Sequence, residues 1–202
     1  MKLLRTAILA IVVCTTLQSP VDSQEAIPYV PSTMPVVAKM LELASVTKDD
    51  IVYDMGCGDG RILIMAAKKY GARGVGVDLD PVRIAEAKKN AEQEGVSHMV
   101  EFRAEDGTKT DISKATVVTL YMFKWFNNAI SPKLQKLRPG SRVVAHDFDI
   151  DDWKPTSVVN LDAERNNHEG IERPHTLYLW LVGASEKTES ALAHQQRSRI
   201  GY

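Results

Sequence analysis

The sequence is poor in cysteine, and this excludes a fold that is held together by disulfides. Its 202 residues contain two cysteines, and the first of them, Cys14, lies in a hydrophobic N-terminal segment. Removal of that segment would leave Cys57 alone, and the mature chain would then form no internal disulfide. The five histidines are scattered along the chain without the spacing of metal ligands, so the sequence predicts no metal site.

The sequence also lacks an excess of charge of either sign. Its formal net charge of −1 gives no overall attraction to nucleic acid or to an anionic membrane. The chain has no detectable internal repeat, and a length of 202 residues suits one domain that is large enough to bury a core. We therefore expect a monomeric globular protein that does not bind nucleic acid.

No apolar run reaches the ~20 residues that a membrane-spanning helix needs. Two basic residues precede an uncharged N-terminal segment, whose strongly apolar part covers only residues 7–13. Val21 and Ser23 are small enough for signal cleavage before Gln24. We therefore predict that residues 1–23 are a signal peptide or hydrophobic leader, which contacts the membrane during export. A buried helix is the alternative, and the lack of a polar face disfavours it.

The rest of the chain predicts one domain over residues 24–184, with a proline-containing extended arm at 24–33, followed by a polar flexible tail at 185–202. Between arm and tail, apolar spacing predicts a helix at 35–44, strand 50–55, helix 60–71, strand 72–79, helix 81–95, strands 98–106 and 114–123, helix 127–140, and strands 141–148, 156–162 and 175–183. No helix fits between the last two strands, so we expect them to pair antiparallel. The order predicts an α/β fold: a Rossmann-like, seven-stranded, mostly parallel sheet with helices on both faces.

The stretch "VYDMGCGDGRI" places a glycine-rich loop directly after the first strand. Its glycines, Gly56, Gly58 and Gly60, allow tight turning and the close approach of a ligand to the backbone. The dinucleotide fingerprint needs a glycine where this chain has Arg61, and a phosphate-binding P-loop is absent. The spacing therefore disfavours NAD and ATP, although an ordinary strand–helix turn remains an alternative.

Acidic residues follow the first three strands, where a parallel sheet binds its ligands. Asp54 can pair with an ammonium group, Asp78 can accept hydrogen bonds from ribose hydroxyls, and Asp106 can reach an adenine amino group. Each acid taken alone is also compatible with a solvated loop charge. Together they specify an ammonium, a ribose and an adenine without a phosphate, which matches S-adenosylmethionine.

At this point the sequence resembles the seven-strand class I methyltransferases, which implies that residues 24–184 are a methyltransferase domain. It is most similar to the archaeal broad-specificity protein lysine methyltransferases and to the mitochondrial enzymes that methylate a lysine of the ATP synthase c-subunit. The resemblance runs over about residues 28–182 and includes the general motifs "IVYDMGCGDGRI" and "GVGVDLDPVRI". The segments "PYVPST" and "RVVAHDFDIDDW" are more specific to this family.

The resemblance implies roles for residues at matching positions. Tyr29 and Tyr121 would be catalytic, placing aromatic faces against the amine and the sulfonium for ~0.5–2 kcal/mol each, and simple packing is the alternative for both. Asp78 departs from the glutamate that relatives often have, but both accept ribose hydrogen bonds. The implied cofactor-binding residues are Tyr29, Pro31, Thr33, Asp54, Gly56, Gly58, Asp59, Gly60, Asp78, Leu79, Asp106 and Gly107.

The implied function is S-adenosylmethionine-dependent N-methylation of protein lysine by direct methyl transfer. A small-molecule methyltransferase and an exported, catalytically silent binding protein are the alternatives. The acidic residues Asp147, Asp149, Asp151 and Asp152 form either a solvated acidic loop or a negative rim that attracts a basic substrate segment. The leader predicts export or membrane association, whereas the cofactor is made in the cytoplasm; the sequence leaves this conflict unresolved.

Overall fold

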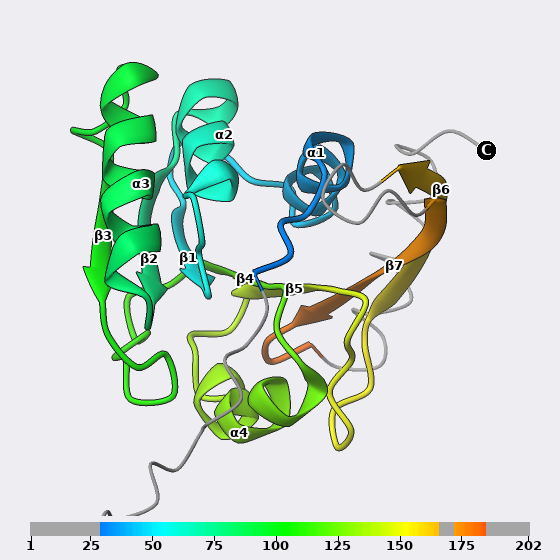
Figure 1. Ribbon diagram of the computed structural model, residues 1–202. Helices are drawn as coiled ribbons and strands as arrows, with labels where there is room; N and C mark the ends of the chain where they lie inside the picture. Colours follow the sequence, from blue (N-terminus) through cyan, green and yellow to red (C-terminus); the bar gives the residue numbers. More distant parts are fainter. Residues whose placement is uncertain (1–28, 166–171, 185–202) are drawn as a thin grey trace, which may run out of the picture.

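The computed structural model describes residues 29–165 and 172–184 (Figure 1). The predicted leader, the part of the arm before Tyr29 and the predicted tail lie outside the described residues. Among the described residues, no helix combines the length and the apolar character that crossing a membrane requires.

Helices and strands alternate through most of the described chain, as the apolar spacing predicts. Helices α1 and α3 begin at the residues that the sequence favours, because the side chains of Thr33 and Asp80 cap them and a proline lies in each first turn. The elements are α1 (Met34–Leu43), β1 (Ile51–Met55), α2 (Arg61–Tyr70), β2 (Arg73–Asp78), α3 (Pro81–Gln93), β3 (Val100–Ala104), β4 (Val117–Leu120), α4 (Lys124–Leu134), β5 (Arg142–His146), β6 (Ser157–Arg165) and β7 (Glu172–Leu181).

The strands form one seven-stranded sheet in the order β3-β2-β1-β4-β5-β7-β6. Strands β1 to β5 are parallel, whereas β7 pairs antiparallel with both β5 and β6. The predicted mostly parallel sheet with a closing antiparallel pair is therefore confirmed. The chain runs outward from β1 to β3 and then returns to β4, so the strand order reverses between β1 and β4. In sheets of this kind, ligands bind beyond the carboxyl ends of the strands at that reversal.

Helices cover both faces of the sheet, as predicted. Helices α1, α2 and α3 pack on one face, where they share a core cluster with alternate residues of β1, β4 and β5. Helix α4 packs on the other face through Phe126, Ile130 and Leu134 (Figure 1). The alternation of buried residues in the central strands, such as Val52 and Tyr53 in β1, sends one side chain to each cluster.

Several boundaries differ from the predictions, and the largest differences are in α4 and in the final strand pair. Helix α4 begins at Lys124, three residues before the predicted start, because Phe123 precedes it without a side-chain capping bond that the sequence would reveal. The final strand pair extends beyond residues 156–162 and 175–183 and contains a register shift between Leu161 and Glu164. Helix α4 also ends earlier than predicted, at Leu134, because Pro132 lies near its end, and the final strand pair is longer than predicted. The predicted topology is unchanged.

Candidate active site

The loop between β1 and α2 folds over the carboxyl end of β2. The backbone N–H groups of Gly56 and Cys57 donate to the Val77 carbonyl, each at 2.9 Å. The Gly58 N–H donates to the Asp78 carboxylate, also at 2.9 Å. Left-handed φ angles of 79°, 52° and 80°, which glycine adopts without steric strain, occur at Gly56, Gly58 and Gly60. The loop backbone is thereby fixed against the end of β2.

Two side chains lie directly on this glycine loop. A β-carbon placed on Gly58 would lie 2.5 Å from the ring of Tyr29, and one on Gly56 would lie 2.4 Å from the sulfur of Met122. Tyr29 comes from the arm, and Met122 comes from the segment that follows β4. The arm and the end of β4 therefore meet at the loop. Contact of Tyr29 with the cofactor stays a prediction.

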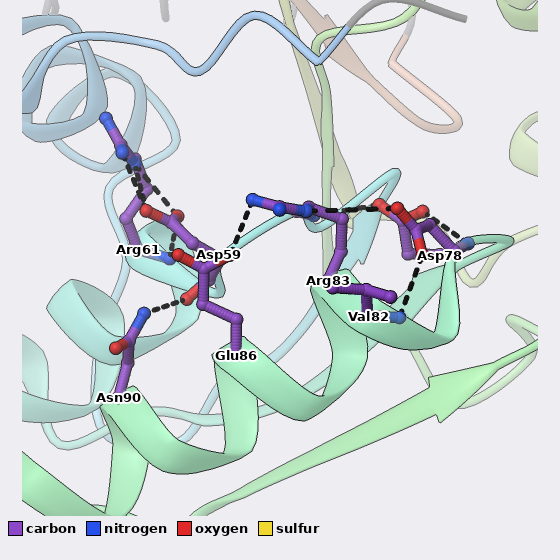
Figure 2. A network of polar contacts seen from close by, with 9 residues as sticks. Asp59, Arg61, Asp78, Val82, Arg83, Glu86 and Asn90 are labelled. Atoms are coloured by element: carbon purple, nitrogen blue, oxygen red, sulfur yellow. Dashed lines mark hydrogen bonds and ion pairs between the residues drawn. The ribbon is translucent and has the colours of Figure 1, made fainter. Parts of the chain in front are cut away.

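Arg61 joins the loop to the arm. Its guanidinium binds both carboxylate oxygens of Asp59 at 2.6–3.1 Å (Figure 2). Its remaining nitrogen donates to the Ser32 carbonyl at 2.9 Å. Partial burial opposes ionisation of Asp59, but the hydrogen bonds and charge of Arg61 hold its pKa below the ordinary value. Asp59 is thus an ionised anchor for Arg61, and its predicted contact with the cofactor stays a prediction.

The predicted ribose acid lies beside a second arginine. Asp78 accepts hydrogen bonds from the backbone N–H groups of Gly58 and Asp80, each at 2.9 Å (Figure 2). Arg83, on the first turns of α3, places its guanidinium 4.6 Å from the centre of the Tyr29 ring. Tyr29 of the arm, Gly58 of the loop and Asp78 of β2 therefore lie together in one group of residues.

Asp54 lies beneath the loop with only 2% of its surface exposed. Burial raises the pKa of its carboxyl to about 7; the hydrogen bond from Thr119 opposes this rise, and the charges of Asp78 and Asp59 add to it. The Thr119 hydroxyl donates to Asp54 at 2.7 Å. Neighbouring acids oppose the ionisation of this buried carboxyl. It therefore favours binding of a cation, because a positive charge stabilises the carboxylate.

The predicted adenine acid has local partners in this structure. Asp106 accepts hydrogen bonds from the backbone and hydroxyl of Thr108 at 2.9 and 2.7 Å, and it pairs with Lys109 at 3.1 Å. Gly107 lies against the Phe126 ring, since a β-carbon there would approach the ring to 2.9 Å. Leu79 is 66% exposed, so its apolar side chain is available to a flat ring. Contact of these residues with adenine stays a prediction.

We call the residues around the glycine loop (Tyr29, Asp54, Gly56, Gly58, Asp59, Gly60 and Asp78) the cofactor half of the site. The ends of β4, β5 and β7 carry a second group, which we call the acceptor half, comprising Tyr121, His146, Asp147, Arg173 and His175. The predicted catalytic residue Tyr121 accepts a hydrogen bond from Arg173 at 2.9 Å, and its ring stacks on His146 with centroids 3.9 Å apart.

The two histidines of the acceptor half touch each other. His146 Nε2 lies 2.8 Å from His175 Nδ1, and His146 Nδ1 lies 2.8 Å from the Ser32 hydroxyl. Burial is the main reason why the pKa of His146 falls to about 3, which keeps its imidazole neutral. Ser32 therefore binds Arg61, the partner of Asp59 in the cofactor half, through its carbonyl, and binds the acceptor half through its hydroxyl.

Three donors of the acceptor half are close enough to suit a metal ion: His146, Asp147 and His175. However, the 2.8 Å contact between the histidine nitrogens fits a hydrogen bond, and Arg173 binds the Asp147 oxygen that would face the ion, at 2.6 Å. A guanidinium at that oxygen opposes a second cation. The contacts therefore fit a hydrogen-bonded group better than a metal centre.

The acidic residues after β5 are tied to helix α4. Lys124 pairs with Asp149 at 2.9 Å and with Asp151 at 2.5 Å, and Asn128 donates to Asp151 at 2.7 Å. The side chain of Lys124 offsets two of the charges that the sequence assigns to a negative rim. These contacts fasten the loop after β5 to the beginning of α4.

A pocket of about 440 Å³ lies behind the loop, between α2 and α3. Its lining shares Asp59 with the cofactor half and includes no residue of the acceptor half. The pocket therefore adjoins the site but does not contain the acceptor half.

Several residues of the site are missed by reasoning from the sequence. The sequence marks Arg61 only as the position where a dinucleotide site needs glycine, and nothing in its neighbourhood signals contact with the arm. Arg173 and His175 lie in a strand for which the sequence predicts only that it closes the sheet. The "HTLYLWL" segment carries a histidine at the start of an apolar run, which is a weak signal on its own.

The sheet order, the glycine loop and the acids at the strand ends define a Rossmann-like class I methyltransferase. Residues 54–157 match the family model described as the ANTKMT methyltransferase domain. The chain belongs to this family of S-adenosylmethionine-dependent methyltransferases.

Similar proteins support the same class. A protein-lysine N-methyltransferase of Saccharolobus islandicus is 44% identical over 78% of this chain and 94% of the relative. An ATP synthase c-subunit lysine N-methyltransferase of Xenopus laevis is 31% identical over 87% of this chain and 72% of the relative. A crystal structure described as an RNA methyltransferase from Salinibacter ruber, in complex with S-adenosyl-L-homocysteine, is 46% identical with a TM-score of 0.69; it covers 77% of this chain and 95% of its own.

The residues of the cofactor half fit S-adenosylmethionine. Asp54 offers a buried carboxyl for the ammonium group, and the glycines of the loop offer side-chain-free backbone, where a β-carbon would clash. Asp78, at the end of β2, stands where a ribose acid is expected. The donors and acceptors present therefore suit a zwitterionic nucleoside without phosphate.

Proposed function

We propose that this methyltransferase transfers methyl groups to lysine side chains of proteins. The observation that carries the proposal is the 44% identity to a protein-lysine N-methyltransferase over nearly the whole of that relative. The match covers 159 residues, so it extends beyond the cofactor half into the strands that carry the acceptor half. Accordingly, we assign the acceptor half to the incoming lysine.

Bound S-adenosylmethionine supplies an electrophilic methyl group. The neutral lysine amine forms the new nitrogen–carbon bond as the carbon–sulfur bond breaks, the bonding pair stays on sulfur, and one amine proton leaves to solvent. A lysine pKa of about 10.4 means that the site must favour the deprotonated amine or wait for it. Alignment of the reacting atoms contributes up to roughly 7–11 kcal/mol in favourable cases, so an obligatory base is not required.

Tyr121 and Tyr29 have separate roles in this proposal. Tyr121 presents its phenol oxygen and ring face to the amine at the end of β4, beside Met122, which contacts the loop. Tyr29 closes the cofactor half from the arm, where it stacks with Arg83 over Gly58. Aromatic faces near a sulfonium or an ammonium contribute ~0.5–2 kcal/mol each.

The experiment is incubation of the full chain with radiolabelled S-adenosylmethionine and one of three acceptor classes: lysine-rich proteins, RNA or a metabolite extract. We expect label on protein, and peptide mapping should place it on lysine. Label only in RNA or only in metabolites would replace the acceptor class, and cofactor binding without any transfer would favour the silent binding protein. The Gly58→Val variant, which should not bind the cofactor, gives the background.

We also propose that the domain keeps access to cytoplasmic S-adenosylmethionine, whatever the fate of residues 1–23. The proposal follows from the need for cofactor at each turnover. Cell fractionation with N-terminal sequencing of the mature chain tests it. A mature chain that begins near Gln24 and is found only outside the cytoplasm would contradict it.

A further inference from the structure

The acceptor half contains an arginine and an aspartate that the proposed function leaves without a role. Arg173 lies in β7 and Asp147 directly follows β5, and Arg173 links the aspartate to the hydroxyl of Tyr121. We propose that Arg173 and Asp147 are positioning residues for methyl transfer, which hold the Tyr121 phenol in its working orientation. This inference rests on the proposed function, in which Tyr121 meets the acceptor amine.

Asp147 has an unusual backbone conformation for a residue other than glycine. Its φ angle is 62°, in the left-handed region, which persists only where the surroundings determine it strongly. Its carboxylate accepts from Arg173 at 2.6 Å and from the Thr176 backbone at 2.9 Å, and it lies 3.3 Å from nitrogens of both His146 and His175. These four contacts fix the carboxylate at the junction of β5 and β7.

Arg173 transmits that fixed position to Tyr121. One guanidinium nitrogen, Nη1, donates to Asp147 and the other, Nη2, donates to the Tyr121 oxygen at 2.9 Å. The guanidinium is a rigid planar fork, so the direction of one hydrogen bond sets the direction of the other. A lysine at this position has a flexible ammonium that does not reproduce the fork.

The ring of Tyr121 is held independently of its hydroxyl. His146 stacks on it with an interplanar angle of 28°, and His146 is itself fixed by Ser32 on one nitrogen and His175 on the other. His146 is 1% exposed, so water does not compete for these contacts. Residues from the arm, β5 and β7 therefore restrain the phenol at both its ring and its oxygen.

These restraints act on the alignment of the acceptor. The neutral amine must direct its lone pair along the line of the breaking carbon–sulfur bond. An oxygen that accepts a hydrogen bond from one N–H group of the amine can set that direction. Because the Arg173 N–H occupies one lone pair of the Tyr121 oxygen, the second lone pair and the hydroxyl hydrogen keep defined directions. Without the hydrogen bond from Arg173, the Tyr121 phenol is still present but its hydroxyl is less well oriented toward the amine.

The test is a double-mutant cycle of Arg173→Met and Tyr121→Phe, measured as kcat with the acceptor that the wild type labels. Each single change should lower kcat by about 10- to 100-fold, the loss that misplacement of a reacting group produces. Adding Arg173→Met to Tyr121→Phe should cost less than about twofold more, since the two residues act as one unit. Arg173→Lys should not restore the rate.

Two further measurements separate positioning from a general structural role. The dissociation constant of S-adenosyl-L-homocysteine should change less than about twofold in Arg173→Met, Tyr121→Phe, the double variant and Arg173→Lys, because the hydrogen bonds from Arg173 to Asp147 and Tyr121 lie within the acceptor half. Arg103→Met, which removes an arginine paired with Glu101 on β3, should leave kcat unchanged. Denaturant unfolding shows whether each variant folds. If Arg173→Met does not fold, Asp147→Asn takes its place in the cycle.

Three results would overturn the inference. The first is an equal loss of kcat from Arg173→Met in the wild type and in Tyr121→Phe. The second is a loss of cofactor affinity as large as the loss of kcat, and the third is one bound divalent metal ion per chain that Asp147→Asn removes. If the wild type methylates RNA or a small molecule, the cycle is run with that acceptor. If the losses of kcat are then non-additive, the positioning role of Arg173 and Asp147 holds and only lysine is rejected as the acceptor. A wild type that binds cofactor and transfers no methyl rejects both proposals.

Discussion

The two halves of the site are built in different ways. The cofactor half consists largely of backbone and of acids that lie at or directly after the ends of strands β1 and β2, so most of its members lie close together in sequence. The acceptor half consists of side chains from β4, β5 and β7, and the pair His146 and His175 is separated by 29 positions. One half therefore depends on backbone shape, and the other depends on the pairing of distant strands.

The largest effect that we predict breaks the cofactor half alone. Gly58→Val should weaken binding of S-adenosyl-L-homocysteine more than about 100-fold, because valine is strained at a φ of 52° and its β-carbon would lie 2.5 Å from Tyr29. Titration calorimetry measures the change. The matched control is Gly95→Val, where φ is 72° but no atom lies within 4 Å of the added carbon. Unchanged cofactor affinity in Gly58→Val would refute the position of the loop.

The second prediction tests the charge under the loop. Asp54→Asn should weaken cofactor affinity by about 10- to 100-fold at pH 8, the range for losing a charged hydrogen bond. Wild-type affinity should rise from pH 6 to pH 8 as Asp54, with a pKa of about 7, ionises, whereas the affinity of the variant should change little. Calorimetric titration at several pH values measures both curves, and Asp49→Asn is an exposed control. Parallel curves for wild type and Asp54→Asn would contradict the role of Asp54.

The same carboxyl gives the free protein a pH-dependent stability. Its folded-state pKa of about 7 is above the ordinary value of 3.8, so its contribution is fully present below about pH 4 and is lost as pH rises through 7. Relative to Asp54→Asn, the wild type should lose up to roughly 4 kcal/mol of unfolding free energy over that range. Denaturant unfolding at each pH, without cofactor, tests the sign.

The third prediction separates the halves at the residue that joins them. Ser32→Ala removes the hydroxyl bound to His146 but keeps the carbonyl bound to Arg61, so kcat should fall about threefold at constant cofactor affinity. Arg61→Lys removes the fork on Asp59 and should instead weaken cofactor binding about three- to tenfold. Steady-state kinetics measures kcat, and titration calorimetry measures cofactor affinity, in both variants. The same pattern of losses in both variants would mean that the halves are not separable.

The smallest predicted effect concerns the acidic loop after β5. Lys124→Met releases Asp149 and Asp151, and the KM for lysine-rich proteins should fall by about twofold at low salt and be unchanged at high salt. The expected change is small because the ion pair is exposed. Steady-state kinetics at two ionic strengths measure it. A rise in KM would show that fastening the loop matters more than its charge.

The fold is predictable because it depends on local patterns. Apolar runs, glycines after helices and prolines in first turns indicate every strand and the sheet class. The beginning of α4 is not predictable in the same way, since Phe123 supplies no capping side chain. Asp54 and the three glycines of the cofactor half share one stretch of sequence, and Asp78 ends the next strand, so their proximity follows from local patterns. Their contact with the cofactor stays a prediction.

The acceptor half is only partly predictable, and the reason is geometric. Tyr121 follows β4 and is expected at the site. The histidines look scattered because their contact arises only when β7 pairs antiparallel with β5 and sets His146 beside Leu177, two residues from His175. Pairing register of this kind depends on the whole sheet, and no local spacing encodes it.

The double attachment of Ser32 also constrains the order of assembly. Ser32 is among the first described residues to be synthesised, yet its partner His146 follows 114 positions later, and His146 in turn binds His175 in the last strand. Contacts between residues so distant in sequence form slowly, because a long loop must close first. The arm can reach Arg61 through the Ser32 carbonyl early in synthesis, whereas the Ser32 hydroxyl can reach His146 only after most of the domain has been made.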